Sequence, residues 1–177
     1  MLRTMMMLAA LLLATPAIAQ EPPADAPVAG NGAAPTSSGL PIPRFVTLRT
    51  GEINLRTGPG VRYPVDWVYH REGLPVEITA EYDTWRRIRD IDGAEGWVHQ
   101  SMLSGRRAFI ITGTSPQPVY KTANSTASVV AHAEPQAMGE LTACENAWCE
   151  VKFPGTSVRG WMPKGTFYGA YDDEAFK

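Results

Sequence analysis

The sequence predicts an all-β protein built from two tandem small β-barrels, and three observations support this fold class. Residues 44–105 divide into short stretches of strand character separated by turn signals such as Asp92-Gly93. A weaker copy of the same pattern follows about 65 residues later, with Gly160-Trp161 in the place of Gly96-Trp97. Neither copy contains the period of a long amphipathic helix. Five or so short strands in about 60 residues are typical of a small barrel.

The N-terminus has the pattern of a secretory signal peptide. A basic Arg3 precedes the apolar run Met5 to Ala14, and Ala17-Ile18-Ala19 supplies small residues for cleavage after Ala19. The apolar run is too short for a membrane anchor, which needs about 20 residues. We therefore expect residues 1–19 to be removed and the mature chain to be periplasmic or secreted, with no stable membrane insertion.

Composition sets the remaining boundaries. Residues 20–43 are rich in Pro, Ala, Gly and Ser, so they cannot bury enough apolar surface to fold and we expect a disordered linker. The first barrel is expected over residues 44–106, the second over residues 107–170 and an acidic tail over residues 171–177.

The elements of the first copy can be taken in order. Ile53 and Leu55 point to one face of an extended chain and Asn54 to the other, and Gly58-Pro59-Gly60 then forces a loop. A single helical or 3₁₀ turn is expected over residues 99–103, closing the unit. The predicted strands are Phe45 to Leu48, Glu52 to Thr57, Val65 to Tyr69, Leu74 to Ala80, Trp85 to Arg89 and Gly96 to Val98.

Four phrases of the first copy resemble, in the correct order, the signature of bacterial SH3-like (SH3b) domains. They are Asn54-Leu55-Arg56-Thr57-Gly58-Pro59 with Tyr63-Pro64, Gly73-Leu74-Pro75-Val76, Trp85-Arg86-Arg87-Ile88, and Gly96-Trp97-Val98 with Leu103. The resemblance implies an exported, non-catalytic module that recognises peptidoglycan stem or cross-bridge peptides, or an envelope protein. An adaptor or subunit role in an envelope complex without wall binding is the alternative.

Aromatic residues mark the expected binding surface, because the first copy has more of them than so small a barrel can enclose. An extended peptide would lie between the loop that holds Tyr63 and the strands that hold Trp85 and Trp97. Arg56 could contact a carboxylate there. Packing of these aromatic rings at the barrel ends or between the two copies is the competing interpretation.

The second copy departs from the first in its loop. Aligning Val119-Tyr120-Lys121-Thr122 with Asn54-Leu55-Arg56-Thr57 places Ala123-Asn124-Ser125 where Gly58-Pro59-Gly60 stands. Whether the second barrel binds a ligand is therefore open.

Cys144 and Cys149 are the two cysteines of the chain, and they flank a turn that leads into the Trp148 strand. In an exported protein such a pair favours a disulfide over a catalytic thiol. A small cell-wall hydrolase would instead need one of them free near His132, which is a less favoured alternative.

Charge and histidine spacing disfavour other classes of function. The chain has 16 Lys and Arg against 18 Asp and Glu, which gives no basic surface for nucleic acid. The widely spaced His70, His99 and His132 fit no pattern of metal ligands. We expect no cofactor, no metal and no catalytic residues.

Overall fold

The computed structural model describes residues 37–177. The predicted signal peptide, residues 1–19, and residues 20–36 of the predicted linker lie outside the described residues. Both barrels belong to a single compact unit. Within residues 37–177, no helix is long and apolar enough to cross a bilayer.

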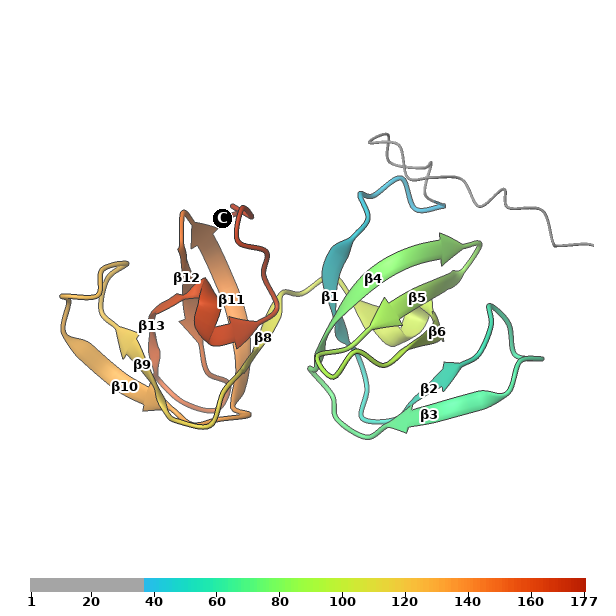
Figure 1. Cartoon of the computed structure of the whole chain (residues 1–177), viewed down its shortest axis with the longest axis horizontal. Coiled ribbons are helices and arrows are strands. Elements are labelled where there is room, and N and C mark those ends of the chain that lie inside the picture. The colour runs from blue at the N-terminus through green and yellow to red at the C-terminus, as the bar shows by residue number, and fades with distance from the viewer. Residues whose placement is uncertain (1–36) are drawn as a thin grey trace, which may run out of the picture. The chain divides into compact units, whose positions relative to one another are not determined.

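The first barrel consists of seven strands in the order β3-β2-β6-β5-β4-β1-β7, with every neighbouring pair antiparallel (Figure 1). Six of these strands were predicted to within two residues, and the short β7 was not predicted. The elements are β1 (Arg44–Leu48), β2 (Ile53–Arg56), β3 (Val65–Tyr69), β4 (Pro75–Tyr82), β5 (Trp85–Arg89), β6 (Glu95–His99), η1 (Gln100–Met102) and β7 (Leu103–Ser104).

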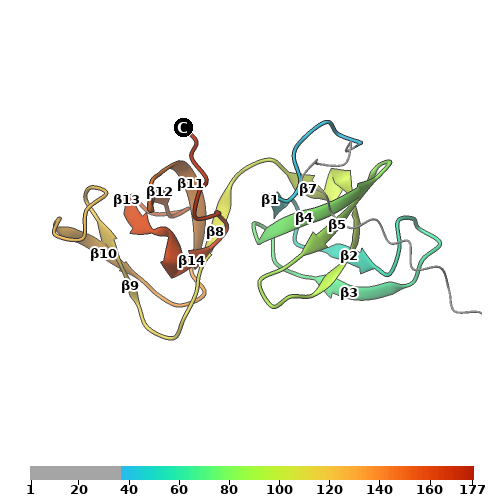
Figure 2. The ribbon, with the colours of Figure 1, turned by 45° about the horizontal axis from the view of Figure 1, so that its top comes forward.

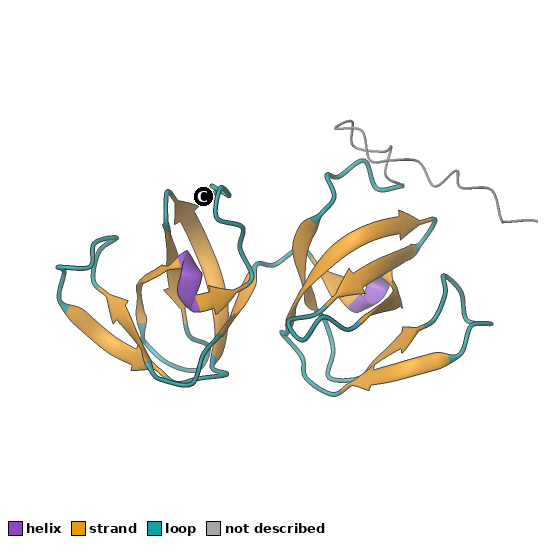
Figure 3. Ribbon diagram, viewed as in Figure 1, coloured by secondary structure: helices purple, strands orange, loops and turns teal. Residues whose placement is uncertain are grey.

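The second barrel repeats this architecture, since its strand order is β10-β9-β13-β12-β11-β8-β14 (Figure 2). In both barrels a short 3₁₀ turn precedes the last strand (Figure 3). The prediction of two tandem SH3-like barrels is thus confirmed. The elements are β8 (Ala108–Ile111), β9 (Gln117–Tyr120), β10 (Val129–Ala133), β11 (Met138–Glu145), β12 (Trp148–Lys152), β13 (Arg159–Pro163), η2 (Lys164–Thr166) and β14 (Phe167–Tyr168).

Alternation along the central strands separates the core from the outer face of each barrel. In β5, Arg86 and Ile88 are buried while Arg87 and Arg89 are exposed. In β6, Val98 is fully buried. The core of the first barrel also contains Leu48, Ile53, Leu55, Val76, Ile78 and Leu103.

The register of the two sheets corrects the expected alignment of the copies by one residue. Arg56 lies opposite Trp97 in the first barrel, and Tyr120 lies opposite Trp161 in the second. Tyr120 therefore corresponds to Arg56, and Val119 corresponds to the buried Leu55 rather than to Asn54. The expected alignment placed Thr122 at the position of Thr57, whereas the backbone hydrogen bonds place Lys121 there.

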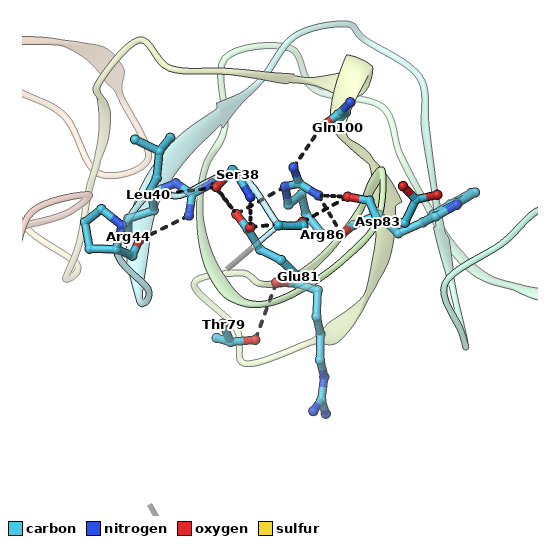
Figure 4. Close-up of polar contacts among 12 residues, drawn as sticks. Ser38, Leu40, Arg44, Thr79, Glu81, Asp83, Arg86 and Gln100 are labelled. Atoms are coloured by element: carbon cyan, nitrogen blue, oxygen red, sulfur yellow. Dashed lines mark hydrogen bonds and ion pairs between the residues drawn. The ribbon is translucent and has the colours of Figure 1, made fainter. Parts of the chain in front are cut away.

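A buried carboxylate anchors the segment before β1. Glu81 has a side chain that is 1% exposed, and its oxygens accept hydrogen bonds from the Ser38 backbone N–H at 2.8 Å and the Ser38 hydroxyl at 2.7 Å (Figure 4). Arg44 Nη2 donates at 2.6 Å, and Arg86 Nε lies 3.3 Å away. Burial alone would raise the pKa of Glu81, but the hydrogen bonds from Ser38 and Arg44 lower it to about 2.

The Cys144–Cys149 disulfide is present, as predicted, and joins β11 to β12. Both cysteines are buried. In the first barrel, Glu81 and Arg86 are paired at the corresponding place, because each of these pairs is the second cross-strand pair from the turn of its hairpin. An ion pair in one repeat therefore stands where a covalent bond stands in the other.

The last residues of the chain pack along the second barrel. The buried Lys164 donates through Nζ to the carbonyl oxygens of Asp172 at 2.9 Å and Glu174 at 2.6 Å. Phe176 exchanges two backbone hydrogen bonds with Cys144, at 2.9 and 3.0 Å. Arg107 forms an ion pair with Glu174. These contacts fix the segment predicted as the acidic tail against β11.

Contacts between the barrels involve strands β8 and β14 of the second. Ile110 is 1% exposed and packs with the core of the first barrel. The ring of Phe45 lies 5.0 Å from that of Tyr168 and 4.7 Å from that of Tyr171. The two repeats thus share apolar side chains across their junction.

Candidate functional site

An aromatic face lies on the outer side of β5 and β6 in the first barrel. Trp85 lies opposite His99, and Arg87 lies opposite Trp97. Their side chains are half-buried or exposed, because the residues between them point into the core. The sheet therefore places the two predicted tryptophans on one surface. We use the name aromatic face for the surface formed by Arg56, Tyr63, Tyr82, Trp85, Trp97 and His99.

The position of Trp85 is fixed by a ring contact. The Trp85 and His99 rings are 5.5 Å apart at 80°, an edge-on arrangement that is favourable for aromatic pairs. His99 Nδ1 lies 2.7 Å from the Ser101 hydroxyl at the start of η1. The indole is thus in contact with the His99 ring and remains partly exposed.

Arg56 has a structural role in the loop that leads to Tyr63. Its Nη1 donates to the carbonyl oxygens of Tyr63 at 2.8 Å and Val61 at 3.2 Å. Gly58 is required in the same loop, because a side chain there would collide with the Tyr63 ring. The structure thus places Arg56 beneath the loop as a support, and a contact of Arg56 with a ligand remains a prediction.

Tyr82 joins the aromatic face although the sequence did not single it out as a binding residue. It lies opposite Trp85 and is 62% exposed. The pKa of Arg62 is raised first by its hydrogen bond to the Tyr63 hydroxyl, and Tyr82 also contributes. A tyrosine beside a two-residue hairpin turn was the signal in the sequence that could have identified it.

The predicted binding residues lie outside four of the larger hollows of the described residues. These four hollows have volumes of about 220 to 550 Å³, and Tyr63, Trp85 and Trp97 line none of them. Trp67, which is 59% exposed, lines a different hollow beside Tyr69 and Asp90. An open face with several half-exposed rings suits an extended ligand that lies across it.

The second barrel lacks much of this face. Trp148 and Trp161 correspond to Trp85 and Trp97, but Glu145 takes the place of Tyr82, since it lies opposite Trp148. Lys121 N donates to Ser128 O as Thr57 N does to Pro64 O, which places Ala127 at the position of Tyr63. The Tyr120 and Trp148 rings are 5.5 Å apart and pack edge-on against each other.

The hydrolase alternative depends on a free cysteine near His132. Both cysteines are in the disulfide, so the free thiol that this alternative requires is not present. Within residues 37–177, no group of three or more His, Cys, Asp or Glu side chains is arranged to hold a metal ion.

Comparison with known proteins agrees with the repeat seen in the fold. A family model described as bacterial SH3 domain matches residues 49–105 and again residues 113–169. Among curated proteins, none is significantly similar to the chain in sequence.

Three solved structures resemble the chain, with TM-scores from 0.32 to 0.34. NlpC2 from Trichomonas vaginalis is 9% identical, with a TM-score of 0.34, and the match covers 75% of this chain and 50% of that one. NlpC1 from Trichomonas vaginalis is 11% identical, with a TM-score of 0.33, and the match covers 76% of this chain and 49% of that one. An NlpC/P60 family protein from Bacillus cereus ATCC 10987 is 12% identical, with a TM-score of 0.32, and the match covers 71% of this chain and 57% of that one. The chain thus spans about half the length of these proteins.

The matched residues contain six of the seven strands of each barrel, all except β1 and β8, and the seven strands of each barrel recur in the same order. The chain therefore belongs to the bacterial SH3 domain family, of which it contains two tandem copies.

Proposed function

We propose that the mature chain is an exported, non-catalytic binding protein that recognises cell-wall peptide through the aromatic face of its first barrel. The observation that carries this proposal is the set of exposed and partly exposed rings at Tyr63, Tyr82, Trp85 and Trp97. Arg56 bonds to the carbonyl oxygen of Tyr63, and the His99 ring packs against Trp85. Rings in this arrangement offer apolar area at low entropic cost, and neighbouring hydroxyls can bond to a peptide backbone.

The ligand that fits this face best is an extended peptide with small side chains. Tyr63, Trp85 and Trp97 line none of the four hollows described above, and Arg87 on the same sheet face is paired with Glu95 at 2.6 Å. Peptidoglycan stem or cross-bridge peptides have this extended character. Several shallow contacts of this kind give modest affinity per site.

Co-sedimentation with isolated peptidoglycan sacculi tests the proposal. The chain from Gln20 to Lys177 should pellet with sacculi, and a variant with Trp85→Ala and Trp97→Ala should lose most of the binding. The matched control carries Trp148→Ala and Trp161→Ala, the corresponding residues of the second barrel, and should pellet like the native chain. Thermal unfolding of each variant verifies that it is folded.

The outcomes separate the two functions considered. Pelleting lost only in the first-barrel variant supports recognition of wall peptide at the aromatic face. Absence of pelleting by the folded native chain at low and at physiological salt would contradict it, and would favour the adaptor function.

A further inference from the structure

One face of the first barrel is covered by the second barrel. Ile110 of β8 packs among core residues that include Tyr69 and Leu74. Around it, the Tyr168 hydroxyl donates to the carbonyl oxygen of Arg89 at 3.2 Å, and the Tyr171 hydroxyl donates to Glu77 Oε1 at 2.6 Å. We call this face the socket and the residues Ile110, Tyr168 and Tyr171 the plug.

The polar border of the socket is repeated on the second barrel. Glu77 lies opposite Arg89 in the first barrel, where they form an ion pair, and Glu140 lies opposite Lys152 at the same register of the second. The backbones of Gln136 and Ala137 form hydrogen bonds with the backbone of Ile111, in the same way as those of Gly73 and Leu74 do with Leu48. The second barrel therefore has its own socket, in a corresponding position.

The floor of the second socket is hollow and apolar. Strand pairing places Ala131 and Ala133 at the positions of Trp67 and Tyr69, and Ala137 stands in the place of Leu74. Three large side chains are thus replaced by alanine. A hollow of about 220 Å³ results, with mainly apolar walls formed by Val119, Ala131, Ala133, Ala137, Phe153 and Val158.

We propose that the second socket is a docking surface for a different folded protein, one that inserts a branched aliphatic side chain with a tyrosine beside it. The plug on the first socket provides the pattern. There the same kind of face buries Ile110 of β8 and accepts hydrogen bonds from the hydroxyls of Tyr168 in β14 and of Tyr171 after it. Apolar walls favour the aliphatic side chain, and Glu140 with Lys152 can bond a hydroxyl.

A second copy of the chain does not fit as the occupant. In each copy, Ile110 is already buried against the first barrel of its own chain. The residues of the first barrel that correspond to Ile110 and Tyr168 are Thr47 and Ser104, given their pairing in β1 and β7. Thr47 is 2% exposed and donates to the carbonyl oxygen of Arg106 at 2.5 Å. The first barrel therefore has no apolar plug to offer.

Site-specific photo-cross-linking from the border of the second socket tests the proposal. A photoreactive residue replaces His132 or Glu134, both exposed beside the hollow, in the full chain expressed in its own cells. The expected adduct is with a different protein, and mass spectrometry should place the link next to an aliphatic residue that neighbours a tyrosine.

Two variants fill the hollow in different ways. Ala137→Glu introduces a charge, and Ala131→Trp restores the side chain found in the first barrel, so at least the second should fold. Each should reduce the adduct about tenfold or more. The matched controls, Ala147→Glu and Ala147→Trp, make the same changes at an exposed position on the β11–β12 turn and should leave the adduct unchanged. Trp85→Ala with Trp97→Ala should also leave it unchanged, which separates this site from the aromatic face.

The remaining outcomes overturn the proposal. These are adducts only with another copy of the chain, adducts only with residues 20–36 of the same chain, an adduct equally strong with Ala131→Trp, or no adduct from either position. Sedimentation of the purified chain provides an independent check, since concentration-dependent dimers abolished by Ala131→Trp would identify a second copy as the occupant.

Discussion

Glu81 in the first barrel and Cys144 in the second occupy the same position, near the end of the long strand that leads into the second hairpin. Glu81 lies opposite Arg86, and Cys144 lies opposite Cys149. Each also holds a terminal segment of the described chain, through Ser38 on the Glu81 carboxylate and through Phe176 on the Cys144 backbone. The two repeats therefore secure the same part of the fold by different chemistry.

The Glu81 cluster should be a major contributor to stability. Replacing Glu81 by Ala leaves Arg44 and Arg86 without their buried partner, and breaking a buried pair on one side costs about 3 kcal/mol of unfolding free energy. Urea unfolding measures this loss. The matched control is Glu95→Ala, whose pair with Arg87 is partly exposed and should contribute less than about 1 kcal/mol. Equal losses in the two variants would contradict the assignment.

Acid should destabilise the protein partly through the same carboxylate. The pKa of Glu81 is about 2 in the folded state against 4.5 ordinarily, so its contribution is full above about pH 5 and is lost as the pH falls toward 2. Unfolding free energies measured from pH 7 to pH 3 should decline less steeply for Glu81→Gln than for the native chain, although Glu81→Gln is less stable at pH 7. Hydrogen bonding to Arg159 also lowers the pKa of Glu150, so part of the decline should persist.

The disulfide should stabilise the second barrel by a modest amount. Cys144 and Cys149 are five residues apart, and closing so short a loop contributes about 2 kcal/mol through the unfolded state. A variant with Cys144→Ala and Cys149→Ala should lose that amount, and the reduced native chain should unfold at a similar urea concentration. Hydrogen exchange should show the loss in β11 and β12, while amides of β4 and β5 stay protected.

Arg56 should affect ligand binding through the loop rather than by direct contact. Lys at this position cannot donate to Val61 and Tyr63 in the same geometry, so Arg56→Lys should cost about 1 kcal/mol and speed amide exchange in residues 57–64. Binding to sacculi should fall with it. Arg87→Lys, on the same face but paired with Glu95, is the control and should leave the loop amides unchanged. Weaker binding by Arg56→Lys with an unaltered loop would instead indicate direct contact.

The strands of the first barrel could be predicted because local signals define them. Asp92-Gly93 forms the predicted turn, with Gly93 at φ 85°, and Ile53 and Leu55 alternate with Asn54 as an extended chain requires. The disulfide followed from the spacing of the cysteines. The alignment of the second copy failed by one residue because the loops differ, and only pairing with β13 shows that Tyr120 matches Arg56.

The aromatic face could be predicted only in part. Trp85 and Trp97 share a face because they occupy alternating positions on neighbouring strands, which a strand pattern reveals. The support that Arg56 gives to the loop depends on backbone carbonyls, which no side-chain pattern indicates. Likewise, no pattern in residues 108–111 indicates that Ile110 belongs to the core of the other barrel, and only the packing shows it.

The two barrels differ at the positions of Ile110 and Tyr168, and this difference also bears on contacts between identical chains. When two different surfaces of identical molecules bind each other and the contacts do not close into a ring, the molecules can assemble into a fibre. Here one end of the pair of repeats carries Thr47 and Ser104, whereas the junction inside the chain uses Ile110 and Tyr168. The first barrel thus presents a polar pair where the second presents apolar and aromatic side chains, so this end lacks the groups that an end-to-end contact of the same kind between identical chains would require.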